Sequence, residues 1–142
     1  MLFCLGLTQA LPAFAKDAIF TATFSNTAVK GYDAVAYFTE GRAVKGTDDF
    51  ELQWKGVDWN FSNAENLAAF KANPERFAPQ YGGYCAWAVS QGYTASTDPK
   101  AWSIVEGKLY LNYSKNVQNT WAQNIPVNIA KADGNWPGVL GE

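Results

Sequence analysis

The chain has 142 residues, of which 48% are hydrophobic and 17% charged, a balance typical of a globular protein with a buried core and not of a disordered chain. Its net charge of −2 comes without a cluster of Lys or Arg, which disfavours binding to nucleic acid or to an anionic membrane surface. There is no histidine, so Ser-His-Asp and Cys-His catalysis within one chain are excluded.

Residues 1–15 are uncharged and mostly apolar, and residues 13–15 form a small-x-small cleavage pattern. Together they are typical of the apolar core and cleavage site of a secretory signal peptide, in a stretch too short to span a bilayer. No Lys or Arg precedes the apolar run, so we expect this signal peptide to be truncated at its N-terminus. The alternative is a buried N-terminal strand or helix. We predict cleavage near Ala15, which removes Cys4, and a periplasmic or secreted mature chain that forms one domain, 16–142.

The next segments predict short β-elements. Residues 19–24 favour a short strand or an ordered arm, and residues 30–33 a turn. The apolar run 34–38 predicts a short buried strand. Apolar residues alternate on both sides of the turn at Lys55-Gly56, which predicts a β-hairpin over 49–61.

A helix is expected after this hairpin. Ser62 and Glu65 fit a capping box, in which Ser62 accepts from the backbone of Glu65 and Glu65 reaches back. The helix ends before Pro74, because the residue that precedes a proline avoids helical dihedrals. Residues 81–89 predict a second helix that begins at a glycine pair.

The remaining elements are a hairpin and two helices. Residues 102–105 and 108–111 flank Glu106-Gly107 as a second hairpin. Ser114 caps a helix that runs to about residue 124, and Pro126 suits the first turn of a last helix. No internal repeat is visible in the sequence. The predicted fold is a small α+β domain of antiparallel hairpins packed with short helices.

Three stretches, 30–38, 54–77 and 81–86, resemble the exported branch of the YHS-domain family, through runs such as Gly-Tyr-Asp and Tyr-Gly-Gly-Tyr-Cys. The resemblance covers about residues 28–137. It implies a mixed α+β fold in a family associated with metal sensing and transport, often of copper. Some members of this branch look like selenoproteins, and the resemblance places their selenocysteine at Cys85.

The chain departs from the metal-binding members of that family. Those domains carry cysteines just after the second hairpin strand and in the following helix. The matching residues here are Ser62 and Asn66, so the thiolate pair is missing and the metal role does not carry over to these positions.

Cys85 is the strongest candidate for a functional residue. In the first turn of the predicted helix, unpaired N–H groups and the positive end of the helix dipole favour thiolate over thiol. A thiolate is both a nucleophile and a soft metal ligand. The alternative is a structural role, because Cys85 shares a helix face with Ala88 and Val89 and can pack as a small apolar residue.

The donors available limit which metal can bind. One cysteine without histidine cannot make a closed zinc site, and Cu(I) takes two or three soft ligands. Copper binding at Cys85 therefore needs a second chain in a homodimer, an external thiol, or weak help from Tyr84, Tyr32 or Asp33. Asp33 has the alternative role of an Asx-turn residue. The acidic residues at 48–51 indicate a solvated edge more than a hard-cation site.

Three functions follow from these residues. The first is an exported binding protein that holds a soft metal ion such as copper through Cys85. The second is a thiol-redox protein, in which Cys85 is oxidised to sulfenic acid or a mixed disulfide and reduced by an external thiol partner. The third is a structural or interaction module with Cys85 buried. No hydrolase or nucleotide-binding motif is present, so we expect binding rather than catalysis.

Overall fold

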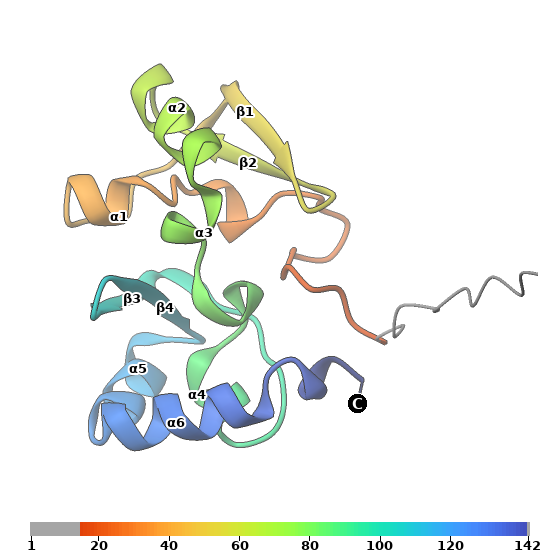
Figure 1. The fold of residues 1–142 in the computed structure, drawn as a ribbon, viewed down its shortest axis with the longest axis vertical. Helices are drawn as coiled ribbons and strands as arrows, with labels where there is room; N and C mark the ends of the chain where they lie inside the picture. Colours follow the sequence, from red (N-terminus) through yellow and green to blue (C-terminus); the bar gives the residue numbers. More distant parts are fainter. Residues whose placement is uncertain (1–14, 142) are drawn as a thin grey trace, which may run out of the picture.

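The computed structural model describes residues 15–141, so Cys4 and all but the last residue of the predicted signal peptide lie outside it. Short helices accompany two separate antiparallel hairpins, which confirms the predicted α+β class (Figure 1). Among the described helices, none has the length and apolar character needed to cross a bilayer.

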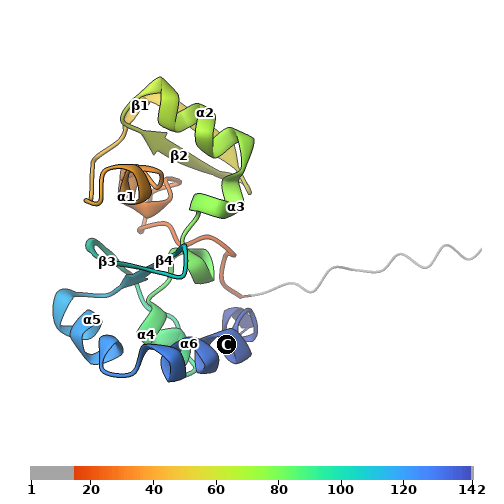
Figure 2. The same ribbon diagram turned by 60° about the vertical axis from the view of Figure 1, so that its left-hand side comes forward.

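The first part of the chain, residues 29–77, is called the N-terminal half. It forms the upper part of the molecule in Figures 1 and 2. Its elements are the 3-10 turn η1 (Val29–Gly31), helix α1 (Ala36–Thr39), strands β1 (Thr47–Trp54) and β2 (Val57–Phe61), and helices α2 (Ala64–Ala72) and α3 (Pro74–Phe77).

The C-terminal half, residues 80–135, lies below it in the same views. Its elements are the 3-10 turn η2 (Gln80–Gly83), helix α4 (Ala86–Ser90), strands β3 (Asp98–Val105) and β4 (Lys108–Asn112), and helices α5 (Lys115–Ala122) and α6 (Ile125–Asn135). A last 3-10 turn, η3 (Gly138–Gly141), follows them.

The two halves repeat one structural unit. Each has, in order, a 3-10 turn, a short helix, a hairpin and two helices. The hairpin turns match closely, since φ is 52° and 75° at Lys55 and Gly56 and 51° and 76° at Glu106 and Gly107. Each hairpin also has one irregularity of register, at the same end of its first strand. The sequence carries a short trace of this repeat, because residues 31–36 and 83–88 share the pattern Gly-Tyr-x-Ala-x-Ala, so the expectation of no internal repeat is wrong.

Both 3-10 turns are left-handed. The φ angles of Tyr81, Gly82 and Gly83 are 57°, 63° and 86°, and the equivalent residues of η1 are also positive. Glycine is required at position 82, because a Cβ there would overlap the carbonyl of Ala18. A right-handed helix needs negative φ. The helix predicted from residue 81 was therefore placed too early, and α4 begins only at Ala86.

The strand predicted over 34–38 was also wrong, because this segment turns into helix α1. Asp33 Oδ1 accepts the N–H groups of Val35 and Ala36 at 2.9 and 3.1 Å. These two bonds satisfy N–H groups that a strand would need for pairing, and they start a helical turn instead.

The cap of α2 differs from the prediction by one residue. The side chain of Asn63 accepts from the backbone N–H of Asn66 at 2.8 Å, while Ser62 bonds to Asp33. The helix still ends before Pro74 as predicted, and Ser114 caps α5 as predicted, with its side chain accepting from the Val117 N–H.

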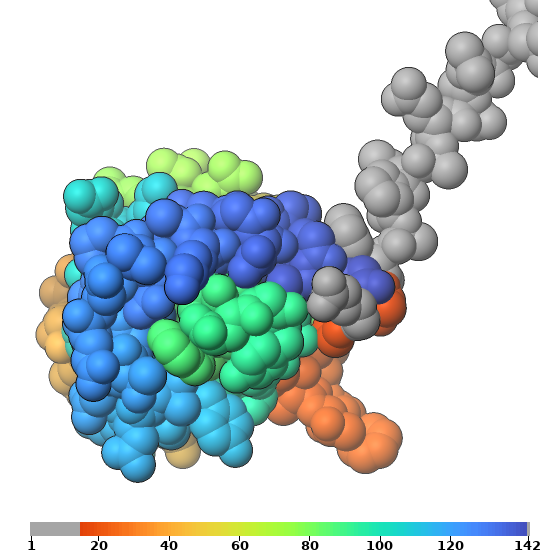
Figure 3. Space-filling model, turned by 90° about the horizontal axis from the view of Figure 1, so that it is seen from below, coloured from red at the N-terminus to blue at the C-terminus, as the bar shows by residue number. Residues whose placement is uncertain are grey.

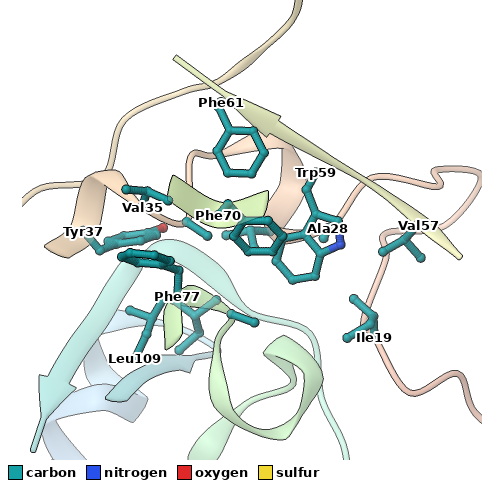
Figure 4. Packing of buried hydrophobic residues seen from close by; sticks show 14 residues of the cluster. Ile19, Ala28, Val35, Tyr37, Val57, Trp59, Phe61, Phe70, Phe77 and Leu109 are labelled. Carbon is teal, nitrogen blue, oxygen red and sulfur yellow. The ribbon is translucent and has the colours of Figure 1, made fainter. Parts of the chain in front are cut away.

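The N-terminal half packs around Phe70. The ring centroids of Trp59 and Phe61 lie 4.9 and 5.1 Å from that of Phe70 (Figure 4), and the ring centroid of Trp54 lies 5.6 Å from it. Leu109 of β4 belongs to the same buried cluster, so the hairpin of the C-terminal half closes the core of the N-terminal half from below. Residues 19–24 form the ordered arm that was one of the two predicted forms, and Phe20 donates to the carbonyl of Gly82.

Candidate thiol site

Cys85 lies at the junction between η2 and α4. It is the N-cap of α4, one position before the first helical residue, and the only cysteine in the part of the chain that the structure describes. Its backbone N–H donates to the carbonyl of Ala95 at 3.0 Å, and its carbonyl accepts from Val89. The residue is 1% exposed, so the sulfur is buried.

The sulfur is surrounded by polar groups. The Tyr113 N–H donates to Sγ at 3.3 Å, and the N–H groups of Trp87 and Ala88 at the start of α4 also act on it. The thiol donates to Oδ1 of Asn112 at 3.6 Å. The N–H groups of Trp87 and Ala88 are donors expected at a helix N-terminus, whereas that of Tyr113 comes from the residue after β4.

The charge state of Cys85 is decided by two opposing effects. Burial raises the pKa of the Cys85 thiol, and the three backbone N–H groups lower it by a smaller amount. The helix start therefore acts in the direction predicted from the sequence, but desolvation of the thiolate outweighs it. The resting form of the site is a thiol.

Asp33 is fully buried and saturated with hydrogen bonds. Besides the two N–H groups that Oδ1 accepts from Val35 and Ala36, Oδ2 accepts the backbone N–H and hydroxyl of Ser62 and the amide of Asn66, at 2.9, 2.8 and 2.9 Å. Asp33 therefore acts as an Asx-turn residue, the alternative that the sequence left open. Ser62 and Asn66, which the sequence resemblance matches to the cysteines of metal-binding YHS domains, are donors to this carboxylate.

Asp33 and Cys85 are equivalent residues of the two halves. Each follows a left-handed turn and a tyrosine, and each precedes a short helix. The backbone N–H groups that approach each side chain come from the second and third residues after it and from the first residue after the second hairpin strand. These donors are Val35, Ala36 and Ser62 for Asp33, and Trp87, Ala88 and Tyr113 for Cys85.

This equivalence indicates which kind of side-chain group the backbone donors around Cys85 suit. We call the three N–H groups around each side chain the cradle. In the N-terminal half the cradle holds a carboxylate, which accepts hydrogen bonds on both oxygens. The cradle of the C-terminal half places donors at the same three positions around the sulfur. The Tyr113 N–H donates to Sγ at 3.3 Å, while the Trp87 N–H makes its hydrogen bond to Oδ1 of Asn112 at 3.0 Å.

The other predicted site residues do not gather around the sulfur. The hydroxyl of Tyr84 donates to the carbonyl of Asp17 at 2.7 Å, in the N-terminal arm. Tyr32 packs against the core of the N-terminal half, and the oxygens of Asp33 are occupied as described. Of the three residues expected to help Cys85 bind a metal, only Tyr84 is its neighbour, and only because it precedes Cys85 in the sequence.

The donors near Cys85 do not fit a mononuclear copper site. Between residues 15 and 141 there is no group of three or more His, Cys, Asp or Glu side chains placed to hold a metal ion. Cu(I) takes two or three soft ligands, and Cys85 supplies one. Copper binding stays a prediction for a site completed by a second chain or an external thiol.

Sequence reasoning missed Asn112. This residue ends β4, is 0% exposed, and presents its amide oxygen to the Cys85 sulfur and to the Trp87 N–H. Its amide nitrogen has no hydrogen-bond partner. The signal in the sequence was a polar residue, Asn112, directly after the apolar run 109–111. The structure shows that the equivalent residue of the N-terminal half is apolar, Phe61.

Comparison of the chain with models of protein families, with curated proteins and with solved structures finds no match. The resemblance to exported YHS domains therefore stays a prediction. The function has to be inferred from the geometry around Cys85.

Proposed function

We propose that this protein is a thiol-redox protein in which Cys85 is the reactive thiol. The observation that supports this proposal is the cradle of backbone N–H groups, which surrounds the Cys85 sulfur as its equivalent surrounds the Asp33 carboxylate. A cysteine that only fills space packs as a small apolar residue and needs no such donors. A sulfur that becomes anionic during its reaction does need them.

The proposed oxidant is a hydroperoxide. The thiolate sulfur attacks one peroxide oxygen, the O–O bond breaks, and an S–O bond forms, so that Cys85 becomes a sulfenic acid and the other oxygen leaves as hydroxide or alkoxide, which takes up a proton. An external dithiol then reduces it. The first thiol forms an S–S bond with Cys85 and releases water, and the second thiol displaces Cys85 and leaves the reductant as a disulfide. The partner must supply both thiols, because Cys85 has no second cysteine beside it among residues 15–141.

Access to the sulfur requires a local opening of the fold. Cys85 is 1% exposed and caps α4, a helix of five residues, and its sulfur lies next to the backbone of Tyr113, whose side chain is 57% exposed. Figure 3 shows the green segment that contains α4 at one face of the molecule, with the blue helices beside it. We propose that the reactive form of Cys85 is reached through such an opening.

The place of the protein in the cell is part of the proposal. The apolar residues 1–15 and the YHS-like motifs support an exported protein of the YHS-domain family, acting in the periplasm or outside the cell. In an oxidising compartment, an unpaired thiol persists only if it is protected or used. Burial protects Cys85 at rest, and a partner dithiol returns it to the thiol after each oxidation.

The test is to treat the purified chain, with Cys4→Ser to isolate Cys85, with hydrogen peroxide and to trap sulfenic acid with a dimedone probe. We expect one adduct on Cys85 by mass spectrometry, none in the matched Cys85→Ser variant, and its loss when dithiothreitol is added before the probe. Labelling that requires denaturant would show an inert core cysteine and overturn the proposal. A parallel sample with Cu(I) tests the copper prediction, since a bound metal protects Cys85 from alkylation.

A further inference from the structure

Asn112 makes contacts that packing alone does not explain. Its Oδ1 accepts the Trp87 N–H at 3.0 Å and the Cys85 thiol at 3.6 Å. The side chain is 0% exposed, and its Nδ2 has no hydrogen-bond partner. A buried amide nitrogen without a partner is rare in folded proteins, because it lowers stability, and it calls for an explanation.

The N-terminal half shows what the cradle does without such a residue. There the Val35 N–H, equivalent to that of Trp87, donates directly to Asp33 at 2.9 Å. Phe61 takes the place of Asn112 and has no polar side-chain atom to compete for this donor. In the C-terminal half, the amide oxygen of Asn112 draws the Trp87 N–H away from the side chain that the cradle surrounds.

We propose that Asn112 is a positioning residue that holds Cys85 in its protonated, resting form, because its amide oxygen accepts hydrogen bonds from the thiol and from the Trp87 N–H. This inference rests on the proposed redox function and concerns the regulation of the same site. When the Asn112 oxygen moves away from the sulfur, the hydrogen bonds that it accepts from the thiol and from the Trp87 N–H break. The thiol can then lose its proton, and the cradle, now including the Trp87 N–H, stabilises the thiolate. Asn112 thus couples local opening to activation.

Other ionisable groups lie on the elements that pack against α4. Tyr81 of η2 donates its hydroxyl to Asp133 of α6, so these two groups pair with each other. The remaining ones are Tyr110 of β4, which is buried, and the exposed lysines Lys108 of β4, Lys115 of α5 and Lys131 of α6. The groups in direct contact with the sulfur are Asn112 and the cradle.

The test compares Asn112→Leu and Asn112→Asp in the full chain with Cys4→Ser. The readout is the rate of alkylation by iodoacetamide as a function of pH. Leucine keeps the size of Asn112 and removes its hydrogen-bond acceptor. We therefore expect the midpoint of the rise of alkylation rate with pH to fall by about one pH unit, and the alkylation rate at pH 7 to rise about threefold. Aspartate keeps the acceptor and adds a negative charge beside the sulfur, so we expect the midpoint to rise and the rate to fall.

Opposite shifts separate this role from simple loosening of the core, which would speed alkylation in both variants. Asn128→Leu is the matched control, since Asn128 is a buried asparagine that donates to Trp121 instead of facing a sulfur, and it must leave the midpoint unchanged. If Asn112→Asp does not fold, Asn112→Met must reproduce the downward shift of leucine. An unchanged midpoint in the leucine variant overturns the proposal. Absence of sulfenic acid in the parent protein, with the midpoint shifts intact, would instead overturn the redox function alone.

Discussion

The Asp33 carboxylate and the Cys85 sulfur occupy equivalent places in the two halves of the molecule, each facing backbone N–H groups from the helix start after it and from the end of its hairpin. One half thus contains a carboxylate where the other contains a thiol. Asp33 is satisfied by five hydrogen bonds and has a structural role. Cys85 has fewer partners and keeps a proton that it can lose, and this difference is why we assign the chemistry to the C-terminal half.

Replacement of Cys85 by aspartate tests this equivalence. We expect Cys85→Asp to fold and to be about 1 to 2 kcal/mol more stable at pH 7 than the isosteric Cys85→Asn, because the cradle donates to a carboxylate and cannot all donate to an amide. Because the advantage belongs to the ionised carboxylate, it is lost as the pH falls through the folded-state pKa of the new carboxyl. Urea unfolding of both variants from pH 3 to pH 7 measures it. An asparagine variant more stable than the aspartate variant at pH 7 would contradict the equivalence.

The buried thiol predicts a loss of stability at alkaline pH. Burial raises the pKa of Cys85 in the folded chain, so the folded state keeps a proton that the unfolded state has lost. Its contribution to stability is full below the unfolded thiol pKa of about 8.5 and declines as the pH rises toward the folded value. Urea unfolding of Cys4→Ser with and without Cys85→Ser, between pH 7 and about 9.5, isolates this contribution, because buried tyrosines titrate higher and in both proteins. If the free energies of unfolding of the two proteins changed with pH in parallel, the pKa of the Cys85 thiol would not be raised.

Asp33→Asn is expected to destabilise the protein by about 3 kcal/mol, because an amide NH₂ would face N–H and O–H donors in a buried site. The loss in free energy of unfolding can be measured by urea titration at pH 7. Asp48→Asn is the matched control, since Asp48 is exposed and has no such network, and it should change stability by less than about 0.5 kcal/mol. Equal effects of the two substitutions would mean that the Asp33 network is not formed.

Phe70→Ala should cost about 3 to 5 kcal/mol, because it opens a cavity among the rings of Trp54, Trp59 and Phe61. Thermal unfolding followed by near-ultraviolet circular dichroism reports both the loss of stability and the change in the packing of these rings. Phe24→Ala, at a fully exposed phenylalanine, serves as the control and should leave both unchanged. A Phe70 variant as stable as the control would place the core elsewhere.

Prediction from the sequence succeeded where structure depends on neighbouring residues. Both hairpins were predicted because Gly56 and Gly107 mark turns between alternating runs. The end of α2 before Pro74 and the cap of α5 at Ser114 follow from the chemistry of single residues. The failed predictions concern hydrogen bonds and backbone angles that periodicity does not reveal. Asp33 bonds to the next residues and starts α1, and left-handed φ angles at 81–83 delay α4. Ser62 bonds to Asp33 across the chain instead of capping α2.

The sequence by itself determined the α+β class, the hairpins, and Cys85 as the residue to examine, because periodicity, turn glycines and the rarity of cysteine are local properties. Only the tertiary structure decided that the chain repeats one unit, that Asp33 and Cys85 are equivalent, and that Asn112 faces the sulfur. The physical reason is that a cradle consists of backbone N–H groups from separate segments, which any residue can supply. The shared Gly-Tyr-x-Ala-x-Ala pattern therefore does not show that these segments meet the ends of the hairpins. The balance between burial and those donors at Cys85 likewise exists only in the folded chain.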